Sequence, residues 1–181
     1  MKMSSPTTLA NAEREALLQL LQRTSALYLA TLEHVSAEQA AFKPAADRWS
    51  IMEIAEHVAI AEEFAYKLAA GATASGEESD PRMDERIHRN AANRAKPFPA
   101  PEEMRPCGRY GSTAEAVAAF RNARQTTIEF VERTQADLRR LRVKHPAGEF
   151  DVYQNLLIGA YHPERHAKQI EEIKACEGYP K

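Results

Sequence analysis

Residues 47–71 read DRWSIMEIAEHVAIAEEFAYKLAAG, and this stretch decides the fold class. Ser50 and Glu53 have the spacing of a helix capping box, and Gly71 supplies a stop signal. Between them, apolar residues recur at steps of three and four and form one stripe: Ile51, Ile54, Ala55, Val58, Ala61, Ala65 and Leu68. The stretch therefore predicts a long amphipathic helix with one face toward a core.

The same plan recurs in three other parts of the chain. A first helix is predicted from residue 8 to about residue 33, with its stripe at Leu17, Leu20, Leu21, Thr24, Leu27, Tyr28, Thr31 and Leu32. A third is capped by Ser112 and Glu115, and its predicted inner face comprises Val117, Phe120, Thr127, Ile128, Val131 and Leu138. A fourth begins near Asp151 and Gln154 and runs to Gly178. Ser36, followed by Gln39, predicts a short capped helical turn before Pro44.

No segment alternates apolar and polar residues for long enough to predict a strand. Four long amphipathic helices predict an all-α fold, a four-helix bundle. Residues 72–111 are rich in Gly, Pro and charge, and form a long connection between the second and third helices, which we expect at the rim of a functional site. The length of 181 residues predicts a single domain over 1–181, with residues 1–7 expected to be disordered.

Composition narrows the possible partners. The formal net charge is −2, from 24 basic and 26 acidic residues mixed along the chain, which argues against a nucleic-acid partner. No apolar run is long enough for a membrane span or a signal peptide, so we expect a cytoplasmic protein without a membrane partner. Cys107 and Cys176 lie far apart without a CxxC spacing, which suits a reducing compartment.

Histidines on two helices suggest a metal site. In YHPERHAKQI, residues 161–170, His162 and His166 lie one helical turn apart on the same face. His57 lies at the shoulder of the second helix, and the pair lies on a comparable shoulder of the fourth. If the shoulders face each other, three neutral imidazoles converge as in an open, catalytic zinc-type site. An i,i+4 pair of histidines also arises by chance in a chain with six histidines. From spacing alone, a metal site and a purely structural role of these histidines are therefore equally open.

Pro163 lies between the paired histidines. It occupies the place that glutamate has in the zincin motif HExxH, so a metalloprotease is not indicated. Because proline has no N–H and crowds the carbonyl of residue 159, a glycine, we expect a local kink. The kink could free a carbonyl near the site, or tilt His162 relative to His166 so that both imidazoles point at one place. The alternative is that it only bends the helix around the core.

The stretch FKPAADRWSIMEIAEHV, residues 42–58, followed in the last helix by H-x-x-x-H-x-x-Q-I, resembles the DinB-like superfamily, including its YfiT-type metal-dependent members. The positions that carry the resemblance are Phe42, Pro44, Trp49, Ser50, His57, His162 and His166. The resemblance implies an up-down-down-up four-helix bundle in which the three histidines bind a divalent metal ion, zinc or nickel. The long segment 72–111 and Pro163 depart from the commoner pattern of the family.

The resemblance also suggests functions. The first hypothesis is thiol-dependent S-transfer, with a low-molecular-weight thiol as a small-molecule substrate; metal-dependent hydrolysis is the alternative, and a non-catalytic metal-binding stress-response module is the third. Glu53, one turn before His57, is a candidate catalytic residue, although capping explains it equally well. Gln169 and Asn155 are candidates for supporting the ligands or contacting substrate. A homodimer is compatible with the sequence.

Overall fold

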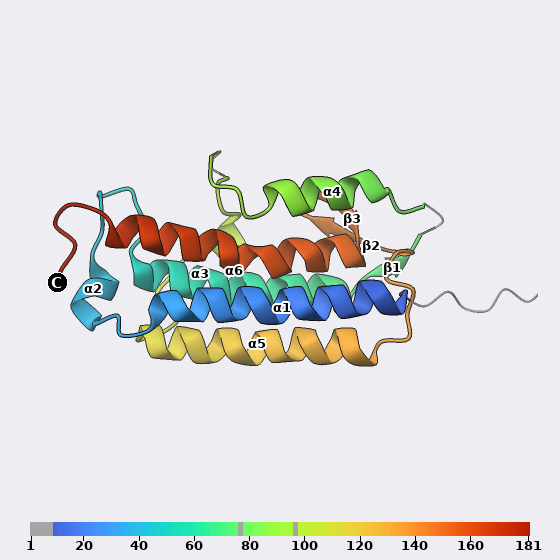
Figure 1. Cartoon of the computed structure of the whole chain (residues 1–181), viewed down its shortest axis with the longest axis horizontal. Coiled ribbons are helices and arrows are strands. Elements are labelled where there is room, and N and C mark those ends of the chain that lie inside the picture. The colour runs from blue at the N-terminus through green and yellow to red at the C-terminus, as the bar shows by residue number, and fades with distance from the viewer. Residues whose placement is uncertain (1–8, 76–77, 96–97) are drawn as a thin grey trace, which may run out of the picture.

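The computed structural model describes residues 9–75, 78–95 and 98–181, so the expected disorder of residues 1–7 lies outside the described part. Four long helices form the bundle: α1 (Asn11–Leu32), α3 (Ile51–Ala70), α5 (Thr113–Arg133) and α6 (Val152–Lys174). Helix α3 packs against α5 and α6, and α1 packs against α6 and α5. In Figure 1, α1 and α6 run in one direction and α3 and α5 in the opposite one. The prediction of a mainly helical bundle is confirmed.

Side-chain caps set where the helices begin. Complete capping boxes, with both reciprocal hydrogen bonds, precede α2 (Ala37–Ala41), α3 and α6, and consist of Ser36 with Gln39, Ser50 with Glu53, and Asp151 with Gln154. At α5, Ser112 accepts from the N–H of Glu115, but the Glu115 carboxylate accepts from the N–H of Gly111 instead of completing the box. The cap signals in the sequence thus mark the starts of these helices correctly.

The core consists of two apolar clusters. One contains Leu17, Leu21, Val131, Leu156 and Leu157 among its buried members, and the other contains Tyr28, Ile54, Val58, Phe120 and Ile170. Two stripe predictions are corrected. Leu27 is 45% exposed, so it lies off the buried face of α1. Leu138 is buried but lies beyond the end of α5, where its carbonyl accepts the N–H of Val152 at 3.1 Å.

A small sheet corrects the all-α prediction. Strands β1 (Thr73–Ala74), β2 (Leu141–His145) and β3 (Gly148–Asp151) pair in the order β1-β2-β3, and both pairings are antiparallel. Val143 pairs with Phe150, and both side chains are buried against the core. These strands contain two to five residues, too few for a visible alternation, so their pairing depends on the packed bundle.

The connection between α3 and α5 contains ordered elements. Besides β1, it holds α4 (Pro81–Asn90), which packs against α6, and the 3-10 turn η1 (Glu102–Met104), which contacts α3. Asp80 caps α4 by accepting the N–H of Arg82, and Pro81 occupies the first helical turn, where a missing N–H costs nothing. Within the described ranges, no helix combines the length and the apolar character that crossing a membrane requires.

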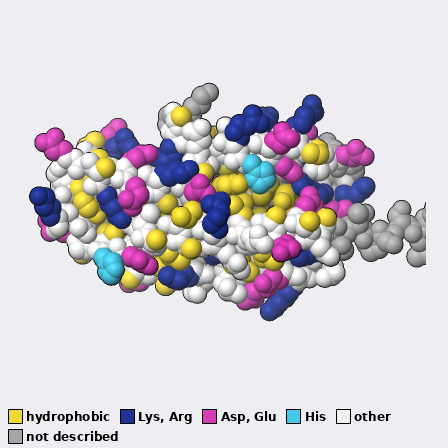
Figure 2. Space-filling model, viewed as in Figure 1, with side chains coloured by type: hydrophobic (Ala, Val, Ile, Leu, Met, Phe, Trp, Pro, Cys, Tyr) yellow, Lys and Arg dark blue, Asp and Glu magenta, His cyan; other side chains and the backbone are white. Residues whose placement is uncertain are grey.

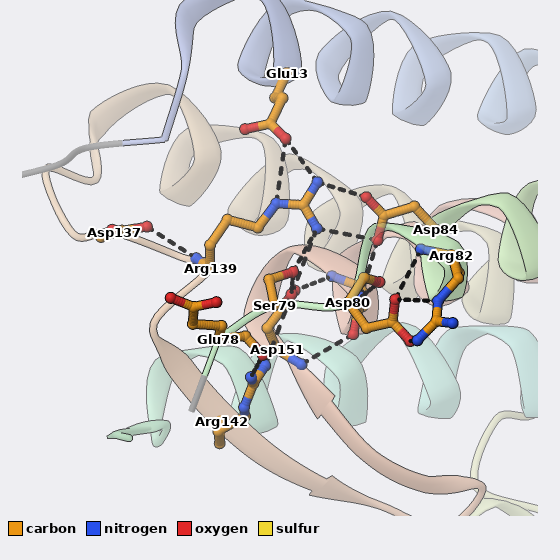
Figure 3. A network of polar contacts seen from close by, with 11 residues as sticks. Glu13, Glu78, Ser79, Asp80, Arg82, Asp84, Asp137, Arg139, Arg142 and Asp151 are labelled. Carbon is orange, nitrogen blue, oxygen red and sulfur yellow. Dashed lines mark hydrogen bonds and ion pairs between the residues drawn. The ribbon is translucent and has the colours of Figure 1, made fainter. Parts of the chain in front are cut away.

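Arg139 joins several segments at the end of the bundle where α6 begins (Figure 3). Its guanidinium donates to Glu13 of α1 at 2.6 Å, to Asp84 of α4 at 2.6 Å and to Asp151 at 3.4 Å. Ser79 also donates to Asp151, which is fully buried as the cap residue of α6. This network therefore fixes the start of α6 relative to α1 and α4.

Two hollows lie outside the histidine region. One, of about 380 Å³, adjoins the Arg139 network and is lined by Leu9, Glu13, Ser79 and Asp137 among others. The second, of about 310 Å³, has lining residues from α1, α4 and α6, including Leu20, His88, Leu157 and Tyr161. Hydrophobic side chains gather beneath α4 on the face shown in Figure 2. None of the three candidate metal ligands lines either hollow.

Candidate metal centre

Three imidazoles converge where α3 meets α6. The Nε2 atom of His162 lies 3.1 Å from Nε2 of His57 and 3.1 Å from Nε2 of His166, and one ring nitrogen from each residue lies within 4.8 Å of the others. The two helices approach closely, since a Cβ atom at Gly159 would lie 3.2 Å from Cβ of Ala65. The structure thus brings together the three histidines that the sequence predicted as ligands, although His57 and His162 lie 105 residues apart in the chain.

The outward nitrogens of two rings have hydrogen-bond partners that fix their tautomers. His57 Nδ1 lies 2.7 Å from the carbonyl oxygen of Met104, and His166 Nδ1 lies 2.9 Å from Oε1 of Gln169. Both oxygens can only accept, so each Nδ1 carries the proton and each Nε2 presents a lone pair. The amide orientation of Gln169 follows from Arg94, a pure donor, whose Nη1 lies 3.1 Å from the same oxygen.

The Nε2 atoms that face the shared centre have too few protons to hydrogen-bond one another fully. Neutral His162 can place one proton on its Nε2, which satisfies either His57 or His166 but not both. At least one lone pair therefore points at the shared centre without a donor. A divalent cation bound by imidazole nitrogens removes this deficit, and carbonyl or amide partners on Nδ1 are typical of metal-bound histidines. The donor set fits a metal ion.

Burial keeps the three rings neutral. The pKa of each lies below the ordinary value of 6.5, and the largest cause is loss of water, which penalises the imidazolium. A proton on one ring would also repel a proton on the next, which lowers the pKa of His162 and His166 further, whereas the hydrogen bond to Met104 partly opposes the effect of burial at His57. Neutral imidazole is the form that binds metals, so the rings are ready as ligands at neutral pH.

Arg94 supports the site from outside the helices that carry the histidines. Besides Gln169, it donates two bonds of 2.8 Å to the carboxylate of Glu172. The chain of contacts runs from Glu172 through Arg94 and Gln169 to His166, and locks the ring of His166. Sequence reasoning predicted a supporting role for Gln169 but missed Arg94, which follows α4 in a segment where many charged residues give no distinguishing signal.

The other candidates make their hydrogen bonds elsewhere. Glu53 uses one carboxylate oxygen to accept the N–H of Ser50 and the other to pair with Lys43, each at 2.7 Å. Asn155 donates to the carbonyl of Ala65 at 3.0 Å, and its buried Oδ1 has no hydrogen-bond partner among the described residues. A catalytic role for Glu53 and a substrate contact for Asn155 remain predictions.

A buried polar layer crosses the bundle one turn from His162. Because Pro163 has no N–H, the carbonyl of Gly159 lacks its usual helical donor, and Arg124 Nη2 donates to it at 3.2 Å. The same nitrogen lies 2.7 Å from Oε2 of Glu62, whose Oε1 accepts from Thr127 at 2.8 Å. The carbonyl that Pro163 leaves open therefore becomes part of a buried ion pair linking α3, α5 and α6.

Comparisons with known proteins give the family. YfiT from Bacillus subtilis, described as a probable metal-dependent hydrolase with an unusual four-helix bundle topology, matches with a TM-score of 0.60 and 12% sequence identity, over 98% of this chain and 94% of YfiT. At this identity the likeness concerns the fold. No curated protein matches the sequence. A sequence model of the DinB superfamily matches residues 20–170, most of the chain. The resemblance seen in the sequence is confirmed, and the chain belongs to the DinB superfamily.

Proposed function

We propose that the chain is a divalent-metal-dependent enzyme whose ion is held by His57, His162 and His166. The observation that carries the proposal is the convergence of three Nε2 atoms, two of them with the Nδ1 proton already committed to an oxygen. Among the described residues, the cluster contains no fourth His, Cys, Asp or Glu ligand. Three protein ligands with an open position are typical of catalytic sites, whereas structural zinc sites are closed by a fourth.

Zinc and nickel are the proposed ions, because imidazole nitrogen suits both. When bound, such an ion supplies a Lewis acid that lowers the pKa of a coordinated water or thiol toward neutrality. The chain itself supplies the rest. Met104 and Gln169 hold the rings of His57 and His166 in their ligand tautomers, and the buried surroundings keep the imidazoles uncharged.

Hydrolysis of a small-molecule substrate is the reaction proposed first. An open metal position needs only water as the second reactant, and the description of YfiT as a probable metal-dependent hydrolase supports the assignment. Thiol-dependent S-transfer is the second candidate. Arg94, Arg124 and Arg165 contribute to the lowered pKa of His162 and His166, and positive charge near the site also favours a thiolate anion, although Glu172 and Glu62 partly offset the charges of Arg94 and Arg124. A non-catalytic metal-binding module would be favoured by a fourth protein ligand.

We also propose that the four long helices follow an up-down-down-up order within a single domain. The helix directions in Figure 1 support the up-down-down-up order, with residues 72–111 crossing from the end of α3 to the start of α5. Core contacts join all four long helices, which supports a single domain.

Metal analysis tests the site. We expect purified protein to contain a divalent ion by inductively coupled plasma mass spectrometry, and His57→Ala, His162→Ala and His166→Ala each to lose most of it, because two imidazoles hold an ion poorly. His88→Ala is the control: this exposed imidazole on α4 contacts Tyr161 rather than the cluster. Equal metal content in the parent and all three site variants would contradict the proposal.

The reaction is tested on metal-loaded protein. Ester, amide and phosphoester substrates probe hydrolysis, and low-molecular-weight thiols with electrophiles probe S-transfer. The expected result is turnover that the His162→Ala variant and chelation both abolish. Turnover in neither assay by fully loaded protein would favour the non-catalytic module.

A further inference from the structure

Glu56 is a buried carboxylate directly before the candidate ligand His57. It is 2% exposed, and its oxygens accept three consecutive backbone N–H groups, from Cys107 at 2.8 Å, Gly108 at 3.2 Å and Arg109 at 2.8 Å. Gly108 has φ of 78°, a left-handed conformation that turns successive N–H groups toward one anion. Both carboxyl oxygens of Glu56 thus act as acceptors, and these hydrogen bonds offset the cost of burying the group.

The loop that Glu56 holds also supplies the partner of His57. Met104, the last residue of η1, lies three positions before Cys107, and its carbonyl accepts the Nδ1 proton of His57 at 2.7 Å. Pro106 restricts the backbone between these two points. Two adjacent residues of α3 are thus bound to the two ends of one short loop, so the position of the carbonyl oxygen depends on the anchoring of residues 107–109.

We propose that Glu56 is a positioning residue for the metal site: by anchoring residues 107–109, it places the Met104 carbonyl that holds His57 in the tautomer with its Nε2 lone pair toward the ion. The inference rests on the proposed function for its metal, but the tautomer of His57 is a property of the metal-free protein as well. Without the anchor, the carbonyl moves away, Nδ1 loses its acceptor, and the ring exchanges between tautomers and orientations.

Glu56→Gln tests the inference at nearly constant side-chain volume. The amide keeps one acceptor oxygen but presents an NH₂ group to an N–H of the loop, so the three-bond arrangement cannot survive. We expect metal affinity, measured by competition with a chromogenic chelator, to fall about tenfold or more, the range seen when groups that orient ligands are changed. In ¹H–¹⁵N spectra of metal-free protein, His57 should change from one Nδ1–H tautomer to a mixture.

Glu63→Gln is the matched control. Glu63 lies two turns after Glu56 on α3 and pairs with the side chain of Arg109 at 3.2 Å on the surface, so it touches the same loop without the backbone cradle. Exposed ion pairs contribute little, so metal affinity should stay within about twofold of the parent. Gly108→Ala is a second test that leaves Glu56 intact: nothing lies within 4 Å of the added Cβ, so its strain acts on the loop conformation alone.

The outcomes separate the two proposals. A parent protein that binds no metal contradicts the proposed function, while the tautomer of His57 in parent and Glu56→Gln still decides the role of Glu56. Parent-like affinity and an unchanged His57 tautomer in folded Glu56→Gln would overturn the positioning role. Equal losses of affinity in Glu56→Gln and Glu63→Gln would overturn it too. Should Glu56→Gln fail to fold, Gly108→Ala decides, with unchanged affinity and tautomer counting against the inference.

Discussion

The buried ion pair beside the site gives the sharpest stability prediction, through Arg124→Met. The side chains of Arg124 and Glu62 are 4% and 3% exposed, so solvent screens the charges little. Methionine fills much of the volume but leaves Glu62 as a buried carboxylate with Thr127 as its remaining donor, and leaves the Gly159 carbonyl without Arg124. Breaking a buried pair in this way costs about 3–5 kcal/mol in the free energy of unfolding.

The assay is urea unfolding followed by circular dichroism, with thermal unfolding as a second measurement. For a chain of this length, 3–5 kcal/mol corresponds to a fall in Tm of roughly 6–20 °C. Replacing both charges, as in Glu62→Met with Arg124→Met, should recover most of the loss, because removing a whole buried pair is often nearly neutral. The resulting double-mutant cycle should give a coupling of about 2 kcal/mol or more.

A control on the same helix shows whether the effect comes from burial. Arg133 pairs with Glu129 at 3.8 Å, and the two side chains are 79% and 43% exposed. Arg133→Met should therefore change stability by less than about 0.5 kcal/mol. The reasoning is refuted if Arg124→Met also stays within about 1 kcal/mol of the parent, or if the double variant is less stable than Arg124→Met.

Three further outcomes are expected. Gln169→Ala should weaken metal binding about 10–100-fold in calorimetric titration while leaving the metal-free Tm nearly unchanged, because Gln169 orients the ring of His166 without being a ligand; parent-like affinity would contradict this. Asp151→Ala should lower the free energy of unfolding, measured by urea titration, by about 2 kcal/mol or more, because the change removes the cap of α6 and the contacts of Asp151 with Ser79 and Arg139 in Figure 3. A loss under about 0.5 kcal/mol would count against this prediction. The free energy of unfolding of the metal-free protein should decrease as the pH falls below about 6.5, because the unfolded chain then binds protons that the folded site histidines, with their lowered pKa values, do not bind. The urea midpoint should therefore fall between pH 7.5 and pH 5.5, and it should fall less in His162→Gln.

The sequence by itself determined the four long helices and the three histidines that we propose as metal ligands. Caps and stripes are local features, since a capping box needs residues three apart and a stripe needs only the period of the helix. They placed the N-caps of α3 and α6 at Ser50 and Asp151, and the spacing of His162 and His166 put both on one face. The DinB resemblance depended on the same short stretches, which is why a motif of few residues identified the family.

Only the tertiary structure decided which groups meet. The sheet consists of segments too short to show the period of a strand. Leu138, which its spacing assigned to the third long helix, lies beyond the end of α5. Met104 acts on His57 through a backbone carbonyl, which no side chain in the sequence reveals. The sequence does not indicate that Glu56, a charged residue within α3, is buried, because the three backbone N–H groups that bind it belong to a loop more than 50 residues further along the chain. Contacts of this kind depend on the rotation and offset of packed helices, which local patterns do not encode.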